Sequence, residues 1–196
     1  MSDPHQHVII KVLQSGQARI YAGHVGQPGN NENNTVNGSD AYFNYPLGIS
    51  CDPQGNVFVA DSRNNQIRMI SSDGVVRLVA GDKDGASGFA DGIGSAALFN
   101  NPNDVAVDRA GRIFVADTNN HSIRRVLPGT SNVLTVAGDG VAGDGYRVNG
   151  AVSGNGRLSS PRSIACTPAG TLYVFDTGNH KIKSSSGRTS NTTRAT

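Results

Sequence analysis

The stretch PNDVAVDRAGRIFVADTNNHSIRRV, residues 102–126, decides the fold because the chain carries it three times. An earlier copy, PLGISCDPQGNVFVADSRNNQIRMI, occupies residues 46–70, and a later one, PRSIACTPAGTLYVFDTGNHKIK, occupies residues 161–183. The copies begin at Pro46, Pro102 and Pro161, so they are spaced by 56 and then by 59 residues. A sustained period of this size is typical of a repeat architecture, in which each copy forms one structural unit.

Each copy contains short runs of β-branched and aromatic residues separated by Gly, Pro, Asn and Asp. In the first copy, the runs are residues 49–52, 57–60, 67–70 and 76–80. This pattern predicts four short strands joined by tight turns. One such antiparallel sheet cannot bury both of its faces alone, so we expect the copies to stack around an axis as an all-β propeller. A solenoid is the alternative, although its repeats are usually shorter.

Three motifs carry a family resemblance: Pro-x-Gly-Ile-x-x-Asp, Gly-Asn-Val-Phe-Val-Ala-Asp and Asn-His-x-Ile recur in order and in phase. They resemble the NHL-repeat family of β-propellers, and the similarity runs from Ala41 to Lys183. The resemblance implies a propeller, usually six-bladed, that serves as a platform for binding protein or RNA. It also implies a less common alternative, an enzyme similar to the peptide-amidating lyases.

The repeats predict one propeller segment over residues 1–183. We expect an outer half-blade (8–23), two blades (41–81 and 97–138), an inner half-blade (158–183) and a degenerate or disordered tail (184–196). About three blades cannot close a ring, because propellers usually need four to eight. Three arrangements remain open: a fragment of a longer propeller, an open partial ring, or a homodimer whose complementary half-blades close a six-bladed ring.

Composition narrows the class of protein. The net charge of +2 is too small to indicate nucleic acid or a membrane surface as the partner. No apolar run reaches the roughly 18 residues that span a bilayer, and the polar start lacks the basic-then-apolar order of a signal peptide. We therefore expect a cytoplasmic protein. Cys51 and Cys166 share a repeat column with Val107, which predicts two reduced, buried thiols.

Two polar columns of the repeat have a structural explanation. An aspartate ends the second predicted strand of every copy, and its carboxylate is expected to accept backbone N–H bonds from the turn that follows. These residues are Asp61, Asp117 and Asp176. His121 and His180 share a column with Asn65, which offers too few converging ligands for zinc. The sequence therefore predicts no catalytic residue, no metal ligand and no cofactor.

Departures from the repeat are the best candidates for function. After the repeated proline, the copies read Leu47-Gly48, Asn103-Asp104 and Arg162-Ser163. Because structural columns repeat while binding positions diverge, we predict Asn103, Asp104 and Arg162 as contact residues at the mouth of the central channel. Two arginines on loops of the same face, Arg63 and Arg147, complete the predicted binding residues.

These observations favour a non-enzymatic interaction scaffold that binds a protein or peptide partner through the face carrying the long loops. One alternative is a propeller-type lyase or hydrolase with a metal at the central channel. The other is an RNA-binding platform. The long-loop face is not basic, which argues against nucleic acid as the partner.

Overall fold

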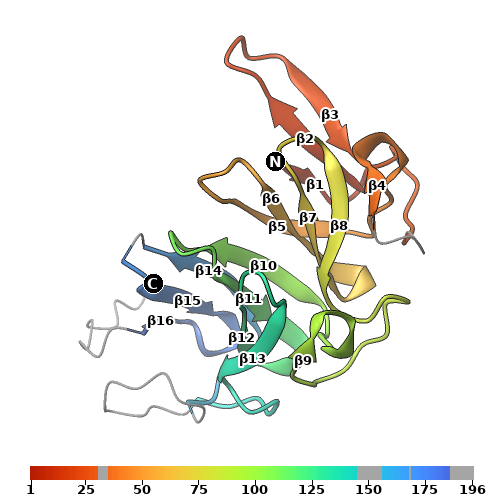
Figure 1. Ribbon diagram of the computed structural model, residues 1–196. Helices are drawn as coiled ribbons and strands as arrows, with labels where there is room; N and C mark the ends of the chain where they lie inside the picture. The colour runs from red at the N-terminus through yellow and green to blue at the C-terminus, as the bar shows by residue number, and fades with distance from the viewer. Residues whose placement is uncertain (31–34, 145–155, 168, 186–196) are drawn as a thin grey trace.

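The computed structural model describes residues 1–30, 35–144, 156–167 and 169–185, and these residues form four antiparallel sheets. Figure 1 shows the sheets fanned around an arc, with the chain passing from one sheet to the next in sequence order. The fold is all-β, as the repeats predict. The helices of the described part are single three-residue turns, none long or apolar enough to cross a bilayer.

The second sheet shows how one repeat folds. Its hydrogen-bonded order is β5 (Pro46–Cys51), β6 (Val57–Asp61), β7 (Gln66–Ile70), β8 (Val75–Ala80) and β4 (Thr35–Asn37). The first four strands follow the predicted runs. The fifth strand, β4, was not predicted, because a three-residue strand carries too few residues for a visible alternation. It pairs through its backbone with the outer edge of β8.

The third sheet repeats this arrangement. Its order is β10 (Pro102–Val107), β11 (Ile113–Asp117), β12 (Ser122–Val126), β13 (Asn132–Ala137) and β9 (Gly92–Ile93). A bulge interrupts the pairing of the third strand with the fourth at the same position in both sheets, which confirms that the copies are structurally equivalent. A 3-10 turn connects each fifth strand to the body: η1 (Gly38–Asp40) and η3 (Gly94–Ala96).

The fourth sheet consists of β14 (Pro161–Cys166), β15 (Leu172–Asp176) and β16 (Lys181–Ser184). Its inner strand, β14, contacts β10, just as β10 contacts β5, so the inner strands lie next to one another. The sheet begins near the predicted boundary but contains three strands rather than the two of an inner half-blade. Most of the predicted tail, residues 186–196, lies outside the described residues.

The first sheet consists of β1 (Ser2–Asp3), β2 (Val8–Val12) and β3 (Ala18–Ala22). It begins earlier than the predicted half-blade because β1 takes the position of a second strand and pairs with β2. Both terminal sheets therefore contain strands at the second and third positions, and they are not the complementary halves of one blade. The predicted homodimer that closes a six-bladed ring stays a prediction.

The hydrophobic core is divided among the three boundaries between neighbouring sheets, which we call the first, second and third seams. Each seam has its own cluster of buried apolar side chains contributed by the two sheets that meet there. Representative residues are Ile9, Phe43 and Val59 at the first seam, Ile67, Phe99 and Val115 at the second, and Ile123, Ile164 and Val174 at the third. Sheet-on-sheet burial is therefore the main favourable term that holds the blades together.

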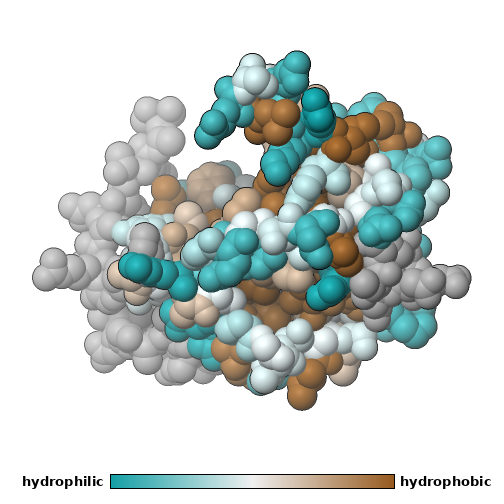
Figure 2. Space-filling view, turned by 45° about the horizontal axis from the view of Figure 1, so that its top comes forward, coloured by the Kyte–Doolittle hydropathy of each residue, from teal (hydrophilic) through white to brown (hydrophobic). Residues whose placement is uncertain are grey.

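Hydrophobic residues also lie exposed on the two outermost faces. Val12 and Ile20 of the first sheet are 55% and 54% exposed, and Ile182 of the fourth sheet is 62% exposed. Its equivalent in the third sheet, Ile123, is 1% exposed because the fourth sheet covers it. Figure 2 shows hydrophobic residues in patches on the face in view, with hydrophilic residues over much of the rest of the surface.

Candidate functional site: the entrance face and its seams

The second strand of every repeat ends in a 3-10 turn, and these turns lie on one face of the molecule. They are η2 (Ser62–Asn64), η4 (Thr118–Asn120) and η5 (Thr177–Asn179). The inner strands β5, β10 and β14 begin on the same face, because each starts opposite the aspartate that ends the neighbouring second strand. We call it the entrance face. It is the face on which the sequence places the binding residues.

A buried aspartate precedes each turn. Each carboxylate accepts a hydrogen bond from the backbone N–H of a residue just before the inner strand of its own sheet. The pairs are Asp61 with Asn44 at 2.7 Å, Asp117 with Asn100 at 2.8 Å, and Asp176 with Ser159 at 2.6 Å. The structural role predicted for this column is confirmed. The bonded N–H groups, however, belong to the segment leading into the inner strand, not to the turn that follows the aspartate.

An asparagine three residues after each of these aspartates adds two further hydrogen bonds. Its side-chain amide donates to the second carboxylate oxygen and to a carbonyl of the long loop, so the long loop is tied to the turn. Asn64 donates to Asp61 and to the Gly29 carbonyl, at 2.9 Å and 2.8 Å. Asn120 and Asn179 repeat both bonds in the third and fourth sheets. The long loops therefore lie beside the turns on the entrance face.

A cation seven residues after each aspartate partly neutralises it. The distance to the carboxylate is 3.8 Å for Arg68, 2.9 Å for Arg124 and 2.7 Å for Lys183. Burial nevertheless raises the pKa of Asp61 to about 7 and that of Asp117 to about 6. The aspartates are therefore parts of the framework and are not presented to a ligand.

Polar contacts across the seams hold the sheets in register. The residue after each turn has a positive φ, a conformation that Asn and His tolerate. Its side chain accepts a hydrogen bond from the backbone N–H that precedes the next sheet's proline. His7 Nδ1 accepts from Tyr45 at 3.0 Å, Asn65 Oδ1 accepts from Asn101 at 2.8 Å, and His121 Nδ1 accepts from Ser160 at 3.0 Å.

Turn hydroxyls form a second set of seam contacts. Ser62 donates to the Pro102 carbonyl and Thr118 donates to the Pro161 carbonyl, both at 2.6 Å. Thr177 holds the equivalent position in the fourth sheet, where its hydroxyl contacts only the Phe175 carbonyl of its own strand at 3.4 Å. Each seam between described sheets is therefore closed by side-chain acceptors or donors in addition to its apolar core.

The predicted mouth residue Asp104 belongs to the third seam. Its carboxylate accepts hydrogen bonds from the Ser163 hydroxyl at 2.8 Å and the Ile164 backbone N–H at 3.0 Å, joining β10 to β14. Burial raises its pKa. On the other side, Gly48 allows β5 to approach, because a Cβ there would lie 2.1 Å from Oδ1 of Asp104. The structure therefore gives Asp104 a joining role between inner strands.

The other predicted contacts are distributed along the entrance face. Asn103 is half-buried on β10, and its Oδ1 has no hydrogen-bond partner among the described residues. Arg162 is exposed at the corresponding position of β14. Arg63 is exposed on η2. Arg147 lies outside the described residues.

Arg63 is the most organised of these contacts. Its guanidinium carbon lies 4.3 Å from the centre of the Tyr45 ring, over the face of that ring. The His5 ring meets the same ring edge-on, with 5.5 Å between the two ring centres. Tyr45 and His5 were not among the residues predicted from the sequence. A signal was present for His5, because residues 3–7 form a fourth copy of the turn motif, with Asp3 and His7 at the aspartate and histidine columns. His5 therefore occupies the same column as Arg63.

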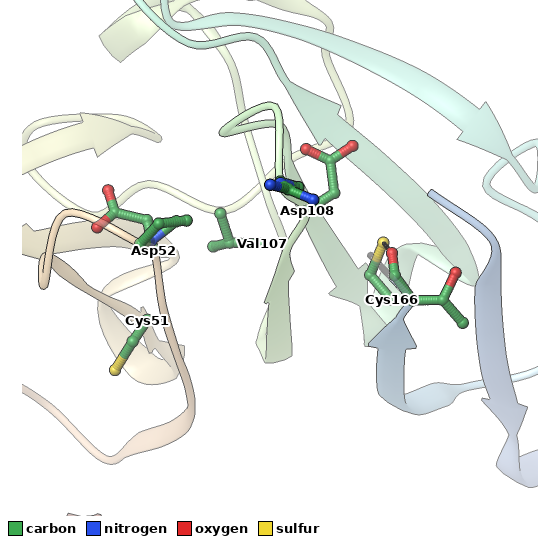
Figure 3. A pocket seen from close by; sticks show the side chains of 8 residues that line it. Cys51, Asp52, Val107, Asp108 and Cys166 are labelled. Carbon is green, nitrogen blue, oxygen red and sulfur yellow. Dashed lines mark hydrogen bonds between the residues drawn. The ribbon is translucent and has the colours of Figure 1, made fainter. Parts of the chain in front are cut away.

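The opposite end of the inner strands holds the two cysteines. Cys51, Val107 and Cys166 line a cavity of about 510 Å³, and Figure 3 shows the two cysteines on either side of Val107. Both thiols are free, as predicted, but the predicted burial is wrong: Cys51 is exposed and Cys166 is half-buried. The column ends the inner strand, at the margin of the core, against which Val107 and Cys166 still pack. Over the described ranges, no three His, Cys, Asp or Glu side chains converge as a metal site.

Comparisons with known proteins agree with this geometry. A sequence model described as NHL repeat matches residues 43–68 and 99–126. The chain is 35% identical to the chloroplastic protein SUPPRESSOR OF QUENCHING 1 of Arabidopsis thaliana, over 93% of this chain and 17% of that protein. It is 37% identical to human NHL repeat-containing protein 2, over 87% of this chain and 24% of that protein. The chain thus spans between a sixth and a quarter of the length of these relatives.

Among solved structures, a Bacteroides thetaiotaomicron protein of unknown function superimposes with a TM-score of 0.71 at 16% identity, over 92% of this chain and 42% of the other. At this identity, the likeness shows the fold alone. The repeat match and the relatives agree with the structure on one conclusion: the chain carries NHL repeats arranged as a β-propeller.

Proposed function

We propose that this chain is a non-catalytic scaffold that binds a protein or peptide partner through the entrance face. The observation that carries the proposal is the contrast between columns on this face. The aspartates, their asparagines and the seam acceptors recur from sheet to sheet, whereas the partly or fully exposed positions beside them differ. Leu47, Asn103 and Arg162 share one such column, and His5, Arg63, Asn119 and Gly178 share another. A framework that repeats while its exposed positions diverge is suited to holding one asymmetric ligand.

The chemistry of the divergent positions supports a protein partner. Arginine and tyrosine are enriched at the residues that dominate protein–protein binding energy. Stacking on Tyr45 fixes the plane of the Arg63 guanidinium before binding, so less side-chain entropy is lost when a partner pairs with its edge. A carboxylate is the protein group that such a fork pairs with most favourably. We therefore expect Arg63 to contact an acidic residue of the partner.

The test is a selection of peptides from a displayed random library on the full chain, followed by affinity measurement by fluorescence anisotropy. Arg63→Asn is the informative variant, because Asn119 holds this position in the third sheet. Arg77→Ala, an exposed arginine on the outer strand β8, is the matched control. We expect acidic peptides whose affinity falls about ten-fold in Arg63→Asn, the loss of one charge-assisted pair, and is unchanged in Arg77→Ala.

Other outcomes would favour the alternative functions. Peptide affinity that is the same in Arg63→Asn as in the unmodified chain would contradict the proposed contact. A stoichiometric, tightly held metal in the purified protein would support the lyase or hydrolase alternative. RNA affinity that falls steeply with salt concentration would support the RNA platform.

A further inference from the structure

The three seams use two different kinds of hydrogen-bond acceptor at the same position. An imidazole Nδ1 accepts the seam bond at the first and third seams, through His7 and His121. A carboxamide oxygen accepts it at the second seam, through Asn65. An imidazole nitrogen can accept a hydrogen bond only while it is unprotonated, whereas a carboxamide oxygen does not titrate.

We propose that mild acid opens the first and third seams locally and leaves the second seam closed. Protonation places an N–H on Nδ1, which then faces the backbone N–H of Tyr45 or Ser160 across about 3.0 Å. Two donors in that position repel each other, so the seam loses its bond and gains an unsatisfied, partly buried backbone N–H. Histidine is the side chain whose charge changes between pH 5 and pH 8.

The charges around His7 affect the pH at which its imidazole is protonated. Asp3 and His5 lie on its own turn, and Arg63 faces it from the second sheet. Burial, followed by the Arg63 charge and then by His5, lowers the pKa of His7, while Asp3 opposes this effect. The neutral imidazole is therefore favoured in the closed seam. Because the open state binds the proton more readily, the stability of the seam falls as the pH drops below about 6.5.

The third seam has a simpler environment. The repeat positions that correspond to Asp3, His5, Tyr45 and Arg63 hold Asp117, Asn119, Ser160 and Gly178. Asp117 is the one charged residue among these four, and its carboxylate already pairs with Arg124. The same bond between an imidazole Nδ1 and a backbone N–H joins this seam, so we expect both imidazole seams to respond to acid.

Opening these seams would move the two arginines of the entrance face. Tyr45, which His7 holds, carries the stacked guanidinium of Arg63. Ser160, which His121 holds, lies two residues before Arg162. Asn101, held by the carboxamide, precedes Asn103 on the inner strand that stays in place. Acid would therefore move Arg63 and Arg162, while the inner strand β10 between them stays in place.

The test is amide hydrogen exchange of the full-length chain at pH 7.5 and pH 5.0, expressed as protection factors corrected for intrinsic exchange. Protection of the Tyr45 and Ser160 amides should fall about ten-fold at the lower pH, the equivalent of one lost hydrogen bond. Protection of Asn101, the internal control, should change by less than about two-fold. Global unfolding is a poor readout, because the raised pKa values of Asp61 and Asp117 make the folded state more stable as the pH falls.

Three variants use residues that the chain itself places in this column. His7→Asn and His121→Asn should each abolish the acid response at their own seam and keep it at the other. Asn65→His should transfer the response to the Asn101 amide. The proposal is overturned if Tyr45 and Ser160 follow Asn101 in the unmodified chain, or if their acid response survives in the asparagine variants.

Discussion

Replacement of Thr118 by valine tests how much a seam hydroxyl contributes to stability. Valine keeps the shape and β-branching of threonine, so the backbone preference is little changed. The Thr118 hydroxyl is buried and donates across the third seam to the Pro161 carbonyl at 2.6 Å. Removal of the hydroxyl loses a hydrogen bond that contributes a net stabilisation of about 1 kcal/mol, and it leaves the Pro161 carbonyl without this donor. The free energy of unfolding should therefore fall by about 1.5–2 kcal/mol in total.

Thr177→Val is the matched control. Its hydroxyl occupies the same position of the repeat but contacts only its own strand, at 3.4 Å, and is partly exposed to water. We expect this variant to change the free energy of unfolding by less than about 0.5 kcal/mol. Urea titration, with the slope checked for constancy, measures both values. Equal losses in the two variants, or none in Thr118→Val, would refute the assignment of a stabilising bond to the seam.

Three further predictions concern the buried cation, the inner strands and the thiols. Arg124→Met should lower the free energy of unfolding, measured in urea, by about 3–5 kcal/mol, because it leaves the buried carboxylate of Asp117 without its cation. Arg68→Met should lower it by less, because Arg68 lies farther from Asp61. Equal losses would contradict this ranking. Gly48→Ala should perturb the neighbouring inner strand in amide spectra, because the new Cβ would lie 2.1 Å from its carboxylate; unchanged shifts there would argue against the close approach. Cys51 should react with a thiol reagent at pH 8 before Cys166, which is half-buried and whose pKa burial raises; mass spectrometry showing the reverse order would contradict the placement.

The sequence predicted the strands of the repeat well because their signals are local. β-branched runs, turn residues and the repeated aspartates recur in phase, so several copies support each assignment. The first sheet was harder. Residues 8–10 are all apolar, and the order Ile10-Lys11, which resembles Ile67-Arg68, predicts that Ile10 matches Ile67; this match is wrong by one residue. The pairing of Ile9 with Ala22, like that of Ile67 with Ala80, shows that Ile9 is the match.

The candidate site was predicted less completely because its contacts cross the seams. Arg63 was predicted from its place on a loop of the long-loop face, but its stacking on Tyr45 depends on how the first two sheets meet. The same is true of Asp104, whose partners lie on β14. Sequence spacing gives the column of a residue, and only the packing of neighbouring sheets decides whether that residue faces solvent or a seam.

Side-chain acceptors after the turns join each described sheet to the next. Nuclear magnetic resonance can detect these bonds directly, as a scalar coupling between two nitrogens across an N–H···N hydrogen bond in uniformly ¹⁵N-labelled protein. At pH 7.5, we predict coupling of the Tyr45 amide nitrogen to Nδ1 of His7 and of the Ser160 amide nitrogen to Nδ1 of His121. The absence of both couplings, or coupling to Nε2 instead, would contradict the account.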